Sequence, residues 1–129
     1  MISIDTNIVV RILTQDDEQQ YQKSLELLQN NDVFIPDTVI LETEWVLRFA
    51  YKFNPIQICQ ALRYLLGLPN VYLADPDLIA KALEWHENGL DFADALHLSK
   101  SQNCQRLYSF DRKFLKKATG LTDCEVQEP

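Results

Sequence analysis

The sequence predicts an α/β fold, a three-layer α/β/α sandwich around a short parallel sheet of four or five strands. Short β-branched or apolar runs alternate with amphipathic helical stretches along the chain, which is the pattern of βαβ units. Strands in such units pair in parallel and are covered on both faces. With 129 residues, 47% of them hydrophobic, and no repeat or linker, we expect a single domain over residues 1–129.

Capping residues mark where each predicted element begins or ends. Asp, Thr and Asn residues precede most helical stretches, and Asn-Pro or Asp-Pro pairs open two of them. The expected strands are Met1–Ile4, Val33–Ile35, Val71–Leu73, Arg106–Phe110 and a small edge strand, Cys124–Val126. The expected helices are Ile8–Leu13, Asp16 to the break at Asn30, Thr38–Phe53, Pro55–Leu66, Pro76 to the stop at Asn88, a helix from Asp91, and Asp111–Ala118.

The predicted helix Thr38–Phe53 is apolar on more than one side, which indicates burial on two sides. Trp45 and Phe49 are candidates for contact with a neighbouring helix or a second subunit, and burial in the core is the alternative. Glu42 is an acid within this apolar segment, where solvation of a polar face does not account for it. Glu44 and Arg48 have the i, i+4 spacing of a surface ion pair.

Charge and cysteine content limit the functional classes. The formal net charge of −7 disfavours generic binding to nucleic acid, because phosphate affinity comes mainly from Lys and Arg. It leaves open a cluster of acids neutralised by cations. Three scattered cysteines suit reduced thiols, and only two histidines without a metal-binding spacing make zinc a poor fit. No apolar run approaches membrane-spanning length and no signal peptide is expected, so we predict a cytoplasmic protein.

Four acids stand near the predicted edge where loops leave the strands. Asp5 follows the first strand and Asp111 follows the fourth. Glu42 lies one turn into the helix after the second strand, and Asp94 lies in the first turn of a helix that Asp91 can cap. Ligands bind at this edge of open parallel sheets. Each aspartate could instead serve only as a helix cap or a first-turn acid.

Clustered carboxylates repel one another unless cations neutralise them. Oxygen ligands without His or Cys suit Mg²⁺ or Mn²⁺, and such ions commonly bind phosphates and activate water. The acids therefore fit either a phosphate-directed metal site or a set of separate capping roles.

Four ordered motifs make the sequence resemble the PIN domain, in particular the VapC-type toxin ribonucleases of bacterial toxin–antitoxin pairs. The motifs span nearly the whole chain, and each is weak alone. They are Ile4-Asp5-Thr6-Asn7, Leu41-Glu42 followed by Trp45-Val46-Leu47, the run from Asp91 to His97, and Ser109-Phe110-Asp111.

Carried over by position, the acidic quartet of the family falls on Asp5, Glu42, Asp94 and Asp111. The resemblance gives supporting roles to Thr6 and Asn7, which match the polar residues beside the first aspartate, and to Ser109, which stands where the family usually has Thr. Asp91 matches a less strictly required position. The departure at Ser109 keeps the hydroxyl.

The resemblance implies hydrolysis of RNA phosphodiester bonds with Mg²⁺ or Mn²⁺ held by Asp5, Asp94 and Asp111. Glu42 would coordinate the metal or orient the attacking water. The resemblance also implies a homodimer and an inhibitory VapB-like antitoxin. Candidate contacts to the RNA backbone are basic side chains, whose alternative role is a solvated helix surface: Arg11, Arg112 and Lys113, with Lys116 and Lys117 less favoured.

Three other functions compete with the nuclease. A haloacid dehalogenase-type phosphatase needs a second acid two residues after Asp5, where Asn7 stands. A receiver domain needs its phosphoacceptor Asp after the third strand, which fits the motif order badly. A non-catalytic PIN-like module that binds RNA or an antitoxin is the remaining alternative, although retention of four mutually repelling acids argues against it.

Overall fold

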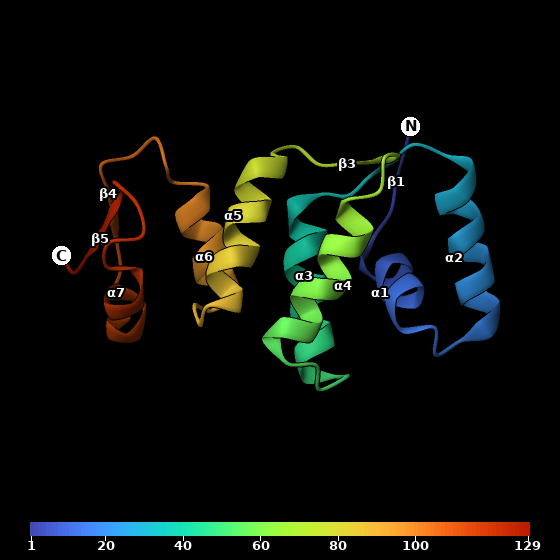
Figure 1. Ribbon diagram of the computed structural model, residues 1–129, viewed down its shortest axis with the longest axis horizontal. Helices are drawn as coiled ribbons and strands as arrows, with labels where there is room; N and C mark the ends of the chain where they lie inside the picture. The colour runs from blue at the N-terminus through green and yellow to red at the C-terminus, as the bar shows by residue number, and fades with distance from the viewer. The chain divides into compact units, whose positions relative to one another are not determined.

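The computed structural model describes residues 1–129, which form two compact units, Met1–Pro76 and Asp77–Pro129. Each unit has its own parallel strand pairing and its own helices, and Figure 1 shows the chain coloured from the blue N-terminus to the red C-terminus. No helix in either unit is both long and apolar enough to cross a membrane.

The first unit contains a three-stranded parallel sheet with strand order β1-β2-β3. The strands are only two residues long, and Val33 at the centre pairs with Ile2 on one side and Val71 on the other. Its elements are β1 (Ile2–Ser3), α1 (Thr6–Thr14), α2 (Glu18–Asn30), β2 (Val33–Phe34), α3 (Asp37–Phe49), α4 (Pro55–Leu66) and β3 (Val71–Tyr72).

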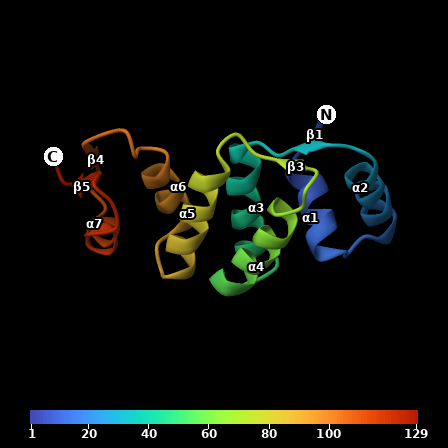
Figure 2. The same ribbon diagram turned by 45° about the horizontal axis from the view of Figure 1, so that its top comes forward.

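Helix packing supplies most of the order in this unit, because such short strands contribute few ladder hydrogen bonds. Helix α1 packs against α2 and α3, and α3 lies beside α4 (Figure 2). The side chains at the centre are aliphatic and almost fully buried, and they come from both the strands and the helices. They include Val9, Val33, Ile35, Ile40, Leu47, Ile58, Leu62 and Leu65.

The second unit contains one parallel strand pair, β4 with β5, in which Leu107 is opposite Val126. Buried Phe92 lies edge-on to the ring of His86, whose Nδ1 donates to the carbonyl oxygen of Leu90 at 2.8 Å. The elements of this unit are α5 (Pro76–Glu87), α6 (Phe92–Ser99), β4 (Arg106–Tyr108), α7 (Arg112–Ala118) and β5 (Glu125–Gln127).

The prediction of an α/β fold with short parallel strands is confirmed. All five expected strands occur, and they pair as a sheet of three and a sheet of two, whereas the sequence predicted one sheet of four or five strands. Hydrophobic patterning indicates which residues are buried, but it does not state which strands pair with one another.

Helix α3 ends at Phe49, four residues before the predicted end at Phe53. The backbone turns sharply at Lys52, which has a φ of 58°, in the left-handed region that a helix cannot continue through. Asn54 then caps α4 with a reciprocal pair of hydrogen bonds to Gln57. The apolar residues after Phe49 had extended the helical pattern without belonging to the helix.

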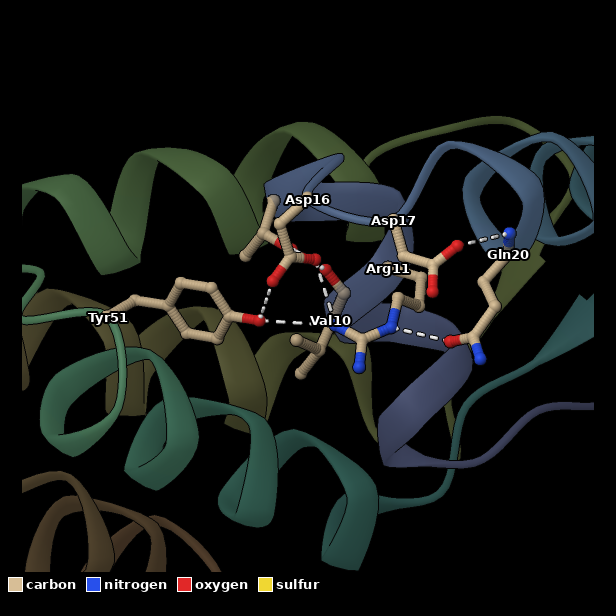
Figure 3. Close-up of polar contacts among 7 residues, drawn as sticks. Val10, Arg11, Asp16, Asp17, Gln20 and Tyr51 are labelled. Carbon is tan, nitrogen blue, oxygen red and sulfur yellow. Dashed lines mark hydrogen bonds and ion pairs between the residues drawn. The ribbon is translucent and has the colours of Figure 1, made fainter.

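A polar network joins α1 to the turn after α3, as Figure 3 shows. The guanidinium of Arg11 donates to Gln20 Oε1 at 2.7 Å, to Asp16 Oδ1 at 2.8 Å and to the Tyr51 hydroxyl at 3.2 Å. Tyr51 in turn donates to Asp16 Oδ2 at 2.6 Å. The hydrogen bond that Tyr51 donates is the main cause of the lowered pKa of Asp16, and the hydrogen bond that Tyr51 accepts is the main cause of the raised pKa of Arg11.

Asn70 ties the end of α2 to the start of β3, so its removal provides a test of this fold. Its side-chain amide donates to the carbonyl oxygens of Leu28 at 2.6 Å and Asn31 at 2.9 Å. We expect Asn70→Ala to lower the free energy of unfolding by about 2 kcal/mol, because two partly buried acceptors lose their donor. Urea denaturation measures this change. A variant as stable as the parent would contradict the assigned role.

Candidate acidic site

Asp5 occupies the turn between β1 and α1. Ile4 continues the strand pairing by donating its backbone N–H to the Phe34 carbonyl at 3.3 Å, so Asp5 stands where the strand ends. Its backbone is extended, and its Oδ1 accepts a hydrogen bond from the Ile8 N–H at 3.2 Å. Asp5 therefore caps α1 with one carboxylate oxygen, and its side chain remains exposed to solvent.

Glu42 is linked to the start of α1 by Thr6. The Thr6 hydroxyl donates to Glu42 Oε1 at 2.5 Å, although the two residues are 36 positions apart. The resemblance gives Thr6 a supporting role beside Asp5, and in the structure its hydroxyl is bonded to Glu42. Glu42 is exposed, so its place in an apolar helix does not mean burial. Asn7 is also exposed at the first turn of α1.

Asp91 and Asp94 divide their roles at the N-terminus of α6. Asp91 is the N-cap, and its Oδ2 accepts from the Asp94 N–H at 3.3 Å. Asp94 is half-buried in the first turn. Burial raises the pKa of Asp94, and the negative charges of Asp91 and Asp111 raise it further, while nearby His97 opposes the shift.

Asp111 caps α7 immediately after β4. Its Oδ1 accepts from the backbone N–H groups of Lys113 at 3.0 Å and Phe114 at 3.1 Å. The hydroxyl oxygen of Ser109 accepts from the Asp111 N–H at 3.0 Å and so fixes the turn that carries the carboxylate. The hydroxyl that serine shares with threonine supplies this contact.

The predicted acids thus gather in two groups. In the first unit, Thr6, the residue after Asp5, is hydrogen-bonded to Glu42. In the second unit, the charges of Asp91 and Asp111 act on Asp94. Within either unit, no group of three or more His, Cys, Asp or Glu side chains is arranged to hold a metal ion. The chemistry of the donors nevertheless fits a hard divalent cation, since all are oxygens and the acids around Asp94 repel one another.

The basic residues proposed to contact the RNA backbone differ in whether they already form hydrogen bonds within the protein. Arg11 is held in the network with Asp16, Gln20 and Tyr51, so a phosphate would have to replace those partners. Lys117 donates to the carbonyl oxygen of Gly89 at 2.7 Å. The remaining candidates, Arg112, Lys113 and Lys116, are exposed on α7.

The structure also corrects the expected surface ion pair on α3. Glu44 and Arg48 do pair, at 2.9 and 3.1 Å, but Glu44 is buried, with 1% of its surface exposed. Trp45 and Phe49 are exposed, so core burial is wrong for both. The i, i+4 spacing predicted the pairing, while which face of the helix is covered depends on its neighbours.

The raised pKa of Asp94 predicts how stability depends on pH. The native state holds this proton more tightly than the unfolded chain does, so stability falls as pH rises from the unfolded pKa of about 3.9 through the raised native value. We therefore expect Asp94→Asn to be more stable than the parent at about pH 7 in metal-free buffer, and to lose this advantage at about pH 3. Thermal unfolding across this range measures the difference, and parallel pH profiles would refute it.

Comparisons with known proteins found one family model and a solved structure to which the chain is similar. A solved structure of the toxin VapC20 from Mycobacterium tuberculosis, described as cleaving the sarcin-ricin loop, is 21% identical over 97% of this chain and 99% of that chain, with a TM-score of 0.45. No curated protein sequence matches significantly. The family model of the PIN domain matches residues 2–120, a span that contains all four predicted acids. The chain belongs to the PIN domain family.

Proposed function

We propose that this protein is a metal-dependent ribonuclease, the VapC-type toxin of a toxin–antitoxin pair, that hydrolyses RNA phosphodiester bonds. The observation that carries the proposal is the PIN-domain match over residues 2–120, a span that contains Asp5, Glu42, Asp94 and Asp111. The negative charges of Asp91 and Asp111 add to burial in raising the pKa of Asp94. Repulsion among these carboxylates lowers the stability of the fold. One capping aspartate would supply the same helix capping without it. A binding site for a cation explains why the acids stand together.

In this proposal Asp5, Asp94 and Asp111 would hold Mg²⁺ or Mn²⁺, with Glu42 as a further ligand or as the residue that orients water. The ion, when bound, would supply an activated water and stabilise negative charge on the phosphate. Asp5 and Asp111 are suited to this role because one oxygen of each is fixed by capping, which orients the other. The Thr6 hydroxyl occupies Oε1 of Glu42 and leaves Oε2 to accept a hydrogen bond from water.

The same assignment extends to the partners and the setting. Arg112 and Lys113, exposed beside Asp111, would contact the RNA backbone, whereas Arg11 is engaged in its own network. The ordered VapC-like motifs support a homodimer, a VapB-like antitoxin that blocks the acidic site, and a cytoplasmic location. A single family match over residues 2–120 supports one domain across the chain.

Cleavage assays with paired aspartate variants test the site. We expect the purified, antitoxin-free protein to cleave total RNA or defined structured RNAs with Mg²⁺ or Mn²⁺ and to stop when EDTA is added. Asp94→Asn should abolish cleavage because it removes a ligand charge. Asp91→Asn is the matched control and should cleave nearly as well, since Asn also caps helices.

Cleavage that survives Asp94→Asn would refute the assignment of the site. A parent protein that binds RNA or an antitoxin and cleaves no RNA would favour the alternative function, a non-catalytic PIN-like binding module. The two outcomes are distinguishable because the first yields metal-dependent cleavage products of RNA and the second yields none.

Thr6 provides a second test, because it acts on Glu42 without carrying charge. We expect Thr6→Val to lower kcat by about 10- to 100-fold, the range seen when the hydrogen-bond partner of a metal-site residue is removed. Thr6→Ser keeps the hydroxyl and should retain most of the activity. Equal activity in the Val and Ser variants would show that the bond to Glu42 does not contribute to the reaction.

A further inference from the structure

The turn between α5 and α6 determines where the acid-bearing helix α6 begins. Gly89 has a φ of 112°, in the region that favours glycine. A backbone hydrogen bond from the Leu90 N–H to the Trp85 carbonyl oxygen, at 3.0 Å, closes the turn. Asp91, the N-cap of α6, follows directly. The conformation of the turn therefore sets the position of the first helical turn, which carries Asp94.

Lys117 holds this turn from α7. Its Nζ donates to the carbonyl oxygen of Gly89 at 2.7 Å, although the two residues are 28 positions apart. This distance is typical of a charge-assisted hydrogen bond. Lys117 stands six residues after Asp111, the N-cap of α7, and thus about 9 Å along the helix from it. One hydrogen bond therefore connects the helix that Asp111 caps to the turn that precedes α6.

Contact with an RNA phosphate, the alternative role for Lys117, fits this surface less well. The hollow between α5 and α7 that Lys117 and Gly89 line also contains Lys81 and Glu84. Lys81 pairs with Glu84 at 3.4 Å, and the Glu84 carboxylate would repel a phosphate. A phosphate would also have to displace the Gly89 carbonyl oxygen from Lys117. The contact to the protein's own backbone is thus the better account of this side chain.

The two helices that Lys117 connects carry acids that repel one another. The negative charges of Asp91 and Asp111 act on Asp94, and this repulsion pushes the N-termini of α6 and α7 apart when no cation neutralises it. The hydrogen bond from Lys117 to Gly89 opposes that separation, because it ties α7 to the residues just before α6. The spacing of the acids then depends on a contact that lies outside them.

We propose that Lys117 is a positioning residue, which holds the start of α6 against α7 and thereby sets the separation of the Asp94 and Asp111 carboxylates for a divalent cation. The proposal rests on the ribonuclease function proposed above. Lys117 contacts neither the substrate nor the cation in this arrangement and acts through the backbone of Gly89. Removal of groups that orient metal ligands typically lowers metal affinity or activity by about 10- to 100-fold.

Binding of Mn²⁺, measured from the electron paramagnetic resonance signal of the free ion, tests the proposal without a cleavage step. We expect Lys117→Met to raise the Kd for Mn²⁺ about tenfold, because methionine keeps an unbranched chain but loses the donor. Loss of positive charge alone would tighten the binding of a cation, so a weakened affinity has the sign that positioning predicts. Lys117→Arg should stay near the parent, since a guanidinium also donates to a carbonyl oxygen.

Lys116→Met is the matched control for this experiment. Lys116 is exposed on the same helix as Lys117, so the substitution removes the same charge and leaves the bond to Gly89 in place. It should not raise the Kd for Mn²⁺. An equal Kd in the two methionine variants, or a tighter Kd in Lys117→Met than in the parent, would overturn the proposal.

Steady-state kinetics separate positioning from contact with RNA. With an RNA that the parent cleaves, and with Mn²⁺ at the Kd of the parent, Lys117→Met should lower the apparent kcat about fivefold, because a site that binds tenfold more weakly is then mostly empty. The KM for RNA should not change. A raised KM with an unchanged kcat would show that Lys117 binds RNA, and positioning would be the wrong role.

Hydrogen exchange in metal-free buffer distinguishes failure of this proposal from failure of the ribonuclease function. The N–H groups of Asp94 and Ala95 both donate to Asp91 at the start of α6. They should exchange about fivefold faster in Lys117→Met than in the parent or Lys116→Met, the effect of losing one hydrogen bond on local opening. If the parent neither binds Mn²⁺ nor cleaves RNA, the ribonuclease assignment fails. Unchanged exchange in Lys117→Met would overturn positioning by Lys117 in either case.

Discussion

Capping of helix N-termini by aspartate is the interaction on which the candidate site depends. Asp5, Asp91 and Asp111 each accept backbone hydrogen bonds at the start of α1, α6 and α7. These bonds satisfy N–H groups that have no partner within the helix, and they fix the rotamer of each carboxylate. Capping and metal binding are consequently compatible uses of one side chain, since a carboxylate has two oxygens and the cap orients both.

The cost of this arrangement is concentrated at Asp94. A capping aspartate gains from the partial positive charge of the helix N-terminus, but Asp94 lies one turn inside α6, half-buried and close to two other acids. Its raised pKa means that the charged form of Asp94 is less stable in the folded protein than in the unfolded chain. Strongly perturbed pKa values cluster at functional sites. Asp94 is therefore a better candidate for a functional role than Asp91, although the two are only three positions apart.

Helix α3 combines a buried face with an exposed face that carries Glu42. Val39, Ile40 and Leu47 bury one side of the helix, while Glu42, Trp45 and Phe49 form the exposed side. Buried Glu44 is tolerated because Arg48 satisfies both of its carboxylate oxygens. The apolar residues on two sides of α3, which the sequence suggested were all covered, thus serve a core on one side and an exposed aromatic surface on the other.

The sequence by itself determined the alternation of strands and helices, the capping residues, and the candidate acids, because each is a local property of residue type and spacing. Tertiary structure alone decided that the Thr6 hydroxyl bonds to Glu42 rather than serving Asp5, that Arg11 is engaged by Tyr51, and that Glu44 is buried. These contacts join residues far apart in the chain or depend on which helix face is covered. Hydrophobic periodicity cannot specify these contacts. It indicates which residues share a face of a helix or strand, but not which other element packs against that face.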